Sequence, residues 1–250
     1  GPAREFNLAL SAEYQALTQS VGDTLVRSYF RPEQRAGGER ALRVASDALR
    51  VFNALFGLYP YTELDIAATT TTAGGIEYPG LIVLNQFYYR GERNERFDWA
   101  NVHEVAHQWW YGVVGNDQLQ EPWLDEALTN YATLLYYEQT TTPETARRLR
   151  EEVFEAPAAQ ARLRGADQPI GLPVKAYAPA DYGAIVYGKG PLFFHALREQ
   201  VGDEVFFKIL RAYYERFAYG IASGEQFLAL AGEIAGQDLR PLYAEWVVGR

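Results

Sequence analysis

The sequence of 250 residues contains no cysteine, no methionine and only three histidines. Without cysteine, disulfide scaffolds, cysteine-ligated zinc or iron–sulfur sites and thiol nucleophiles are all excluded. Basic residues are also few, since 23 Lys and Arg stand against 32 Asp and Glu for a formal net charge of −9. That balance disfavours a protein that binds nucleic acid by neutralising its phosphates. No apolar run is long enough to predict a membrane-spanning segment.

Enough apolar material is present to build a large core, because 48% of the residues are hydrophobic and 14% are aromatic. Within the first 96 residues, alternating or β-branched stretches predict strands at 6–10, 23–30, 63–72 and 81–84. Apolar residues at helical spacing predict a helix over 39–56 that Gly57 ends. Residues 31–38 are polar and turn-rich, and we expect them to be a break.

From residue 97 onward the pattern is helical almost throughout. Helices are predicted over 97–110, 124–137, 142–154, 190–201, 204–217, 224–235 and 239–248. A proline-containing stretch, 156–182, is expected to be a long irregular loop. The outline predicts an α+β fold in a single domain, 1–250, with a mixed β-sheet lobe over 1–96 and a mainly helical lobe over 97–250.

Two of the three histidines lie four residues apart in the segment HEVAH, inside a predicted helix. Four residues advance about 400° along a helix, so His103 and His107 share one face, one turn apart. Two imidazoles at that spacing can bind one zinc ion. Glu104 is rotated by about 100° from His103, so its carboxylate could reach a water at the metal without binding the metal itself.

A catalytic zinc site needs a third protein ligand, and Glu126 is the candidate. It follows His107 by 19 positions and lies in the next predicted helix, in the segment EPWLDEALTNY. Asn130 is one turn further along, on the same face, where its amide could hydrogen-bond a ligand. The sequence therefore predicts one Zn²⁺ per chain, held by His103, His107 and Glu126.

These segments together resemble the gluzincin aminopeptidases related to aminopeptidase N. HEVAHQWW, eighteen intervening residues and WLDEALTNY match the family pattern HExxH-x18-E. GGIEYPG stands where the family has its GAMEN substrate motif, and VYGKGPLFFHAL and the final DLRPLYAEWVVGR resemble later family segments. The resemblance implies a thermolysin-like catalytic domain with its active site at the junction of the two lobes. It also implies that the family's flanking N-terminal β-domain and C-terminal helical domain are absent from this chain.

The resemblance assigns further roles. Glu77 is expected to bind the free α-ammonium of a peptide, with Gly74 and Gly75 letting the peptide backbone pair with this edge. Tyr187 is expected to donate its hydroxyl to the oxyanion, and Tyr182 matches another family tyrosine near the site. GGIEY departs from GAMEN by losing Ala, Met and Asn while keeping the Glu, so the departure falls on the groove that selects the substrate.

The predicted function is zinc-dependent hydrolysis of the N-terminal peptide bond, with Glu104 as general base and peptides with a free N-terminus as substrates. Two alternatives stay open. One is a zinc endopeptidase of the same fold, in which Glu77 does not bind an α-amine of the substrate. The other is a non-catalytic peptide-binding module. His195 has no partner at ligand spacing and is expected to be a packed or surface residue, and Trp109, Trp110 and Trp123 are expected to be core.

Overall fold

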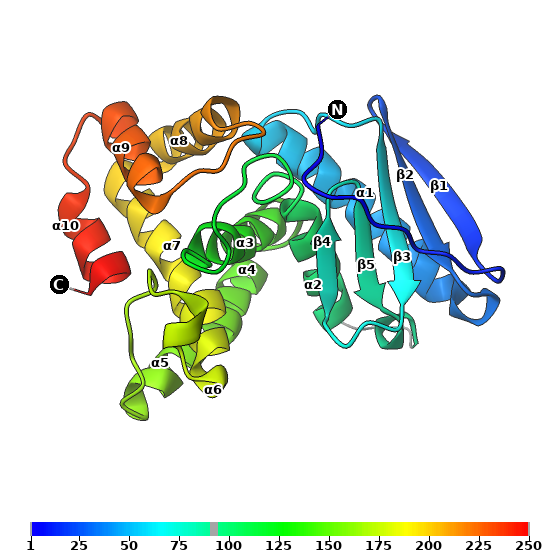
Figure 1. The fold of residues 1–250 in the computed structure, drawn as a ribbon, viewed down its shortest axis with the longest axis horizontal. Coiled ribbons are helices and arrows are strands. Elements are labelled where there is room, and N and C mark those ends of the chain that lie inside the picture. The colour runs from blue at the N-terminus through cyan, green and yellow to red at the C-terminus, as the bar shows by residue number, and fades with distance from the viewer. Residues whose placement is uncertain (1, 91–94, 250) are drawn as a thin grey trace. The chain divides into compact units, whose positions relative to one another are not determined.

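The computed structural model describes residues 2–90 and 95–249. The chain divides into two compact units, Gly1–Val113 and Val114–Arg250. The first unit contains the β-sheet and the second is helical (Figure 1).

The first unit is built on a mixed sheet of five strands in the order β1-β2-β3-β5-β4. The pairs β1–β2 and β5–β4 are antiparallel, and the central pairs β2–β3 and β3–β5 are parallel. The strands are β1 (Gln15–Val21), β2 (Thr24–Phe30), β3 (Glu63–Thr69), β4 (Gly75–Tyr78) and β5 (Leu81–Asn85). β4 lies at the end of this order, so it is an edge strand that pairs with β5.

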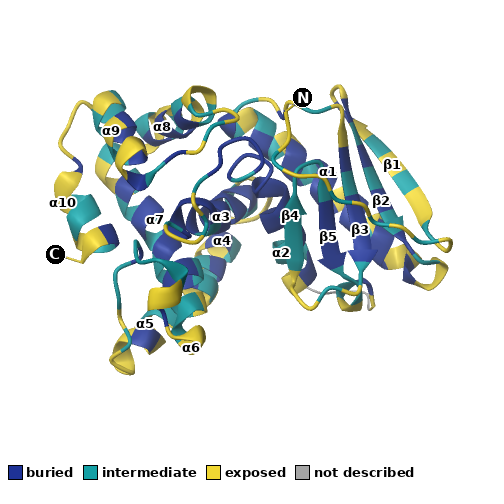
Figure 2. Cartoon of the chain, viewed as in Figure 1, coloured by how far each residue is buried: buried dark blue, intermediate teal, exposed yellow. Residues whose placement is uncertain are grey.

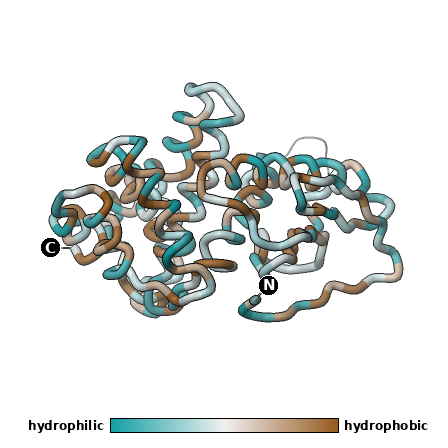
Figure 3. Tube along the Cα trace, turned by 90° about the horizontal axis from the view of Figure 1, so that it is seen from above, coloured by the Kyte–Doolittle hydropathy of each residue, from teal (hydrophilic) through white to brown (hydrophobic). Residues whose placement is uncertain are grey.

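Two helices cover one face of this sheet, α1 (Arg35–Phe56) and α2 (Glu95–Ala106) (Figure 1). Side chains alternate along β3, so Leu64 and Ile66 are fully buried, whereas Asp65 and Ala67 line a cavity of about 680 Å³ together with residues 3–11 of the N-terminal segment. The N-terminal segment over residues 3–11 alternates between hydrophobic and hydrophilic residues along its trace (Figure 3). This period of two is typical of a strand with one buried face.

The core of the first unit is aromatic. Phe52 and Phe56 stack with ring centroids 5.4 Å apart, and Trp109 and Trp110 meet them edge to face. All four side chains are almost completely buried, and Figure 2 shows that the central strands β3 and β5 are largely buried as well. Since both tryptophans lie within three residues of His107, this packing holds the end of α2 against α1.

The second unit is a set of helices around a second aromatic core. Buried Trp123 contacts the rings of Phe193, Phe194 and Phe227. Its α-helices are α3 (Leu128–Thr140), α4 (Pro143–Arg150), α5 (Ala156–Leu163), α6 (Pro179–Tyr182), α7 (Gly190–Val201), α8 (Asp203–Arg216), α9 (Gly224–Ala235) and α10 (Arg240–Tyr243). Wider π-helical turns occur at Trp123–Ala127, Glu151–Glu155, Gly183–Lys189 and Ala244–Val248.

The α+β prediction is confirmed, and so are the helices over 190–201 and 224–235. The predicted strand over 6–10 is wrong. Phe6 and Leu10 are 87% and 81% exposed and lie outside the ladder, and the first strand is β1. The break expected over 31–38 is largely wrong, since α1 already begins at Arg35.

The long irregular loop expected over 156–182 is wrong in part. Its first eight residues form α5, which continues the helix of the preceding π-helical turn Glu151–Glu155. The short β4 at Gly75–Tyr78 was not predicted as a strand. Among the described residues, no helix combines the length and the apolar character that crossing a bilayer requires.

Candidate active site and metal centre

The histidine pair lies at the C-terminal end of α2, and this helix is held firmly in the first unit. Arg40 of α1 makes a two-pronged ion pair with Asp98 in the first turn, at 2.6 and 2.7 Å. The amide of buried Asn101 donates to the main-chain oxygen of Ala41 at 2.9 Å. His103 lies in the last helical turn and His107 just after it. Paired and hydrogen-bonded polar groups of this kind fix a helix against its neighbour.

The two imidazoles converge on one point. His107 Nδ1 lies 2.9 Å from the main-chain oxygen of Trp110, and because a carbonyl only accepts, Nδ1 carries the proton. Nε2 of His107 therefore presents its lone pair, and it lies 3.1 Å from His103 Nε2. A tetrahedral zinc ion with bonds of about 2.0–2.1 Å holds two nitrogen ligands roughly 3.3 Å apart. The pair thus fits a zinc ion with little adjustment.

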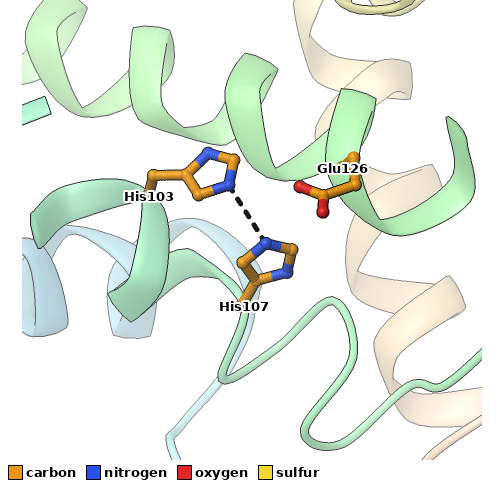
Figure 4. A group of neighbouring side chains, drawn as sticks. All are labelled: His103, His107 and Glu126. Atoms are coloured by element: carbon orange, nitrogen blue, oxygen red, sulfur yellow. Dashed lines mark hydrogen bonds between the residues drawn. The ribbon is translucent and has the colours of Figure 1, made fainter. Parts of the chain in front are cut away.

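Glu126 completes a group of three side chains that could hold a metal ion (Figure 4). The ligand atoms of His103, His107 and Glu126 all lie within 4.8 Å of one another. Glu126 stands on the π-helical turn Trp123–Ala127 that leads into α3. Two nitrogens and one carboxylate oxygen form a donor set that suits catalytic zinc and leaves a position for water or substrate.

Glu104 and Glu77 lie beside the same histidine in the first unit. Ligand atoms of Glu77, Glu104 and His107 are also mutually within 4.8 Å. Glu104 packs against the sheet edge at Gly75, where a Cβ would stand only 2.4 Å from Glu104 Oε1. Gly75 is therefore needed for the close approach of the Glu104 side chain to this strand. The space around Gly74 is looser, since the nearest atom to a Cβ there would be the Tyr88 hydroxyl at 3.4 Å.

The two metal-capable groups are alternatives and not two separate sites. His107 belongs to both, and its Nδ1 is engaged by Trp110, so it offers only Nε2 to a metal. When His107 Nε2 binds a metal together with His103, it cannot also bind a second metal together with Glu77 and Glu104. Glu77 and Glu104 are consequently not ligands of a metal that His103 and His107 bind through these nitrogens.

Tyr187 lies on the π-helical turn Gly183–Lys189 of the second unit. Burial raises the pKa of its hydroxyl well above the usual range, and the charge of Glu126 and a hydrogen bond to that carboxylate raise it further. The hydroxyl therefore remains a proton donor. The amide of buried Asn130 donates to the main-chain oxygen of Tyr187 at 2.9 Å, so Asn130 ties α3 to this turn.

Tyr177, Tyr182 and Tyr187 form a row of aromatic rings, each 5.8 Å from the next. Burial and the charge of Glu126 raise the pKa of Tyr182 as well. At the far end, the Tyr177 hydroxyl accepts a hydrogen bond from the Leu172 amide. Tyr182 thus lies between an anchored ring and the proposed oxyanion donor.

One residue next to the site escaped the sequence analysis. Asp125 is buried, and its carboxylate accepts hydrogen bonds from the side-chain amides of Asn116 at 3.1 Å and Gln118 at 2.9 Å. It thereby anchors the π-helical turn that carries Glu126. Only its adjacency to Glu126 could have indicated this, because its partners are set by tertiary packing. His195 is packed as expected, with Nε2 2.8 Å from an Arg150 nitrogen.

The comparisons with known proteins agree with this site. Residues 40–246 match the peptidase family M1 domain. The chain is 28% identical to "Aminopeptidase M1" of Arabidopsis thaliana over 88% of the chain, and 26% identical to "Aminopeptidase N" of Lactococcus lactis over 83% of it. In both cases it spans 26% of the relative's length.

A solved structure shares the fold. It is an M1 zinc metallopeptidase from Deinococcus radiodurans, an E323A mutant bound to a Tyr-Ser-Ala substrate, and it is 24% identical with a TM-score of 0.70. The match covers 95% of this chain and 52% of that one. Since the family model covers most of the sequence, the chain belongs to peptidase family M1.

Proposed function

We propose that this chain is the catalytic domain of a zinc aminopeptidase that hydrolyses the N-terminal peptide bond of peptides with a free amine. The His103, His107 and Glu126 group supports metal-assisted hydrolysis. Relatives named aminopeptidases, and a structural neighbour bound to a tripeptide, support a peptide substrate. The flanking parts of those longer proteins lie outside the matched region.

The observation that carries the exopeptidase assignment is the position of Glu77. In a peptide, the α-nitrogen and the carbon of the first carbonyl are separated by two bonds, or about 2.5 Å. A carboxylate that binds the ammonium must therefore lie close to the groups that act on that carbonyl. Glu77 meets this requirement, because its carboxylate lies within 4.8 Å of the ligand atoms of both Glu104 and His107.

Each side chain then has a defined task. Zinc, when bound, polarises the scissile carbonyl and lowers the pKa of the attacking water. Glu104 takes the proton of that water and delivers it to the leaving amine. The Tyr187 hydroxyl donates to the oxygen that becomes negative in the transition state.

In the first unit, substrate is held along the sheet edge. Glu77 pairs with the ammonium, and the open side of β4 at Gly74 and Gly75 offers backbone groups to an extended peptide. Tyr182 forms part of the wall beside Tyr187. These contacts place the first peptide bond, and no later one, against Glu104.

A panel of aminoacyl chromogenic substrates tests the proposal. Each is assayed with and without a chelator and against its N-acetylated form. We expect hydrolysis of the free-amine substrates only, its loss with the chelator and its return when Zn²⁺ is added. Equal turnover of the acetylated forms would instead indicate the endopeptidase alternative. Peptide binding without any turnover would indicate the non-catalytic module.

Glu104→Gln separates chemistry from metal binding. Because the amide cannot take a proton, we expect kcat to fall by about 10²–10⁴-fold while the zinc content stays at one ion per chain. Metal analysis of both proteins provides the control. A Glu104→Gln protein with wild-type turnover would remove Glu104 from the mechanism.

A further inference from the structure

Gln108 is a completely buried polar side chain directly after His107. Its Oε1 accepts a hydrogen bond from the Gly80 amide at 2.8 Å, and its Nε2 donates to the main-chain oxygen of Tyr78 at 3.3 Å. The orientation of the amide is determined by these partners, because a backbone N–H only donates and a carbonyl only accepts. A side chain that offers one donor and one acceptor is therefore required here.

Its two partners flank the turn between β4 and β5. Tyr78 pairs with Leu81, so Pro79 and Gly80 form a two-residue hairpin loop. Pro followed by a glycine with a φ of 78° is the signature of a type II turn. Type II turns suit the twist of two-residue hairpins poorly and splay the strands. The hairpin thus benefits from a support outside the sheet, and Gln108 supplies it.

The strand that precedes this turn is short and lies at the sheet edge. β4 has four residues, pairs with β5 and carries Glu77 next to Tyr78. A strand with few ladder hydrogen bonds can shift its register or separate locally from its neighbour. Its ladder with β5 holds it within the sheet, and Gln108 connects it by hydrogen bonds to the segment that carries His107. The distance between the Glu77 carboxylate and the histidine therefore depends in part on this amide.

We propose that Gln108 is a positioning residue that holds the amine-binding Glu77 at its working distance from His107 and thereby determines the preference for substrates with a free N-terminus. The inference rests on the proposed function. Gln108 itself touches neither substrate nor metal, and it acts through the Tyr78–Gly80 backbone.

The test compares Gln108→Met with Gln34→Met. Methionine keeps the length and the volume of glutamine but loses both hydrogen bonds. Gln34 is an equally suitable control, since it is buried and accepts a hydrogen bond from the Arg31 amide at the start of α1. Kinetics are measured on an aminoacyl anilide and on the same acyl anilide without its α-amine.

For Gln108→Met we expect KM for the free-amine substrate to rise about tenfold, with a smaller change in kcat, because ground-state binding is what the misplaced Glu77 loses. The ratio of kcat/KM between amine and desamino substrates should fall by a similar factor. Gln34→Met should leave this ratio unchanged. A folded Gln108→Met protein with the wild-type ratio would overturn the proposal.

One further measurement and a replacement variant keep the outcome clear. Hydrogen exchange at the Gly80 amide should quicken by about tenfold or more in Gln108→Met and stay unchanged in Gln34→Met. Unchanged exchange would overturn the anchoring role whether or not the protein is a peptidase, whereas an inactive wild type would refute the proposed function alone. If Gln108→Met does not fold, Gln108→Glu replaces it, since its carboxylate still accepts from Gly80 but repels the Tyr78 oxygen.

Discussion

Replacing Tyr187 by Phe isolates one hydroxyl of the proposed site. The Tyr187 hydroxyl donates a hydrogen bond to Glu126, so its removal costs that carboxylate a donor. Because Glu126 is only partly buried and water can take the place of the hydroxyl, the free energy of unfolding should fall by only about 1 kcal/mol. The fold is thus expected to survive the change.

The effect on turnover should be much larger. A donor aimed at the developing oxyanion contributes about 2.7–4 kcal/mol, or 10²–10³-fold in kcat. Since that charge is absent from the bound substrate, KM should change little. Steady-state kinetics on an aminoacyl anilide, with zinc content measured in parallel, give both values.

Tyr182→Phe is the matched control for this experiment. It keeps the neighbouring ring, 5.8 Å from that of Tyr187, and removes a hydroxyl whose pKa is raised by burial and by the charges of Glu126, Asp125 and Tyr177. We expect a change in kcat below about threefold, the size of a weak hydrogen bond. A kcat for Tyr187→Phe within threefold of wild type, at full zinc occupancy, would refute the oxyanion role.

Two predictions concern stability. Burial and the charge of Arg150 lower the pKa of His195 in the folded protein. Below about pH 6.5 the unfolded chain therefore binds the proton more readily than the folded chain, and the free energy of unfolding decreases as the pH is lowered. In urea unfolding between pH 5 and 7.5, the free energy of unfolding of His195→Gln should depend less steeply on pH than that of the wild type. An equal pH dependence would contradict the lowered pKa of His195. Gly38→Ala should destabilise by about 1–3 kcal/mol, because its Cβ would stand 2.0 Å from the Phe30 ring. Gly232→Ala, also within a helix but with its nearest neighbour at 3.4 Å, should instead stabilise by about 0.5–1 kcal/mol. Thermal melts of both variants that shift in the same direction would contradict this steric argument.

The elements that sequence reasoning found are those with strong local signals. The helix over 190–201 begins next to a proline and ends at a glycine, and its apolar residues recur with helical spacing. The HEVAH spacing likewise predicted a shared helical face, because helix geometry alone relates His103 to His107. Gly37 and Gly38, by contrast, suggested a break but lie inside α1, since Tyr89 and Phe30 pack where their side chains would be.

The errors share a cause, which is that the local sequence pattern does not determine which tertiary contacts a segment makes. Residues 6–10 alternate like a strand, yet no ladder incorporates them, so Phe6 and Leu10 remain exposed. The π-helical turn Gly183–Lys189 has no period that marks it in a single sequence. It is tied to α3 by the hydrogen bond from Asn130 to Tyr187.

The sequence by itself determined which atoms could bind a metal, because a chain without cysteine and with three histidines has few choices, and the HExxH spacing places two of those histidines on one face. Only the tertiary structure decided what surrounds them. The Trp110 carbonyl selects the tautomer of His107, and Gln108 holds the edge strand that carries Glu77. Asp125 secures the turn of Glu126 through two distant amides. Gln108 lies 28 to 30 positions from its partners Gly80 and Tyr78 in the chain, so packing alone brings these residues together.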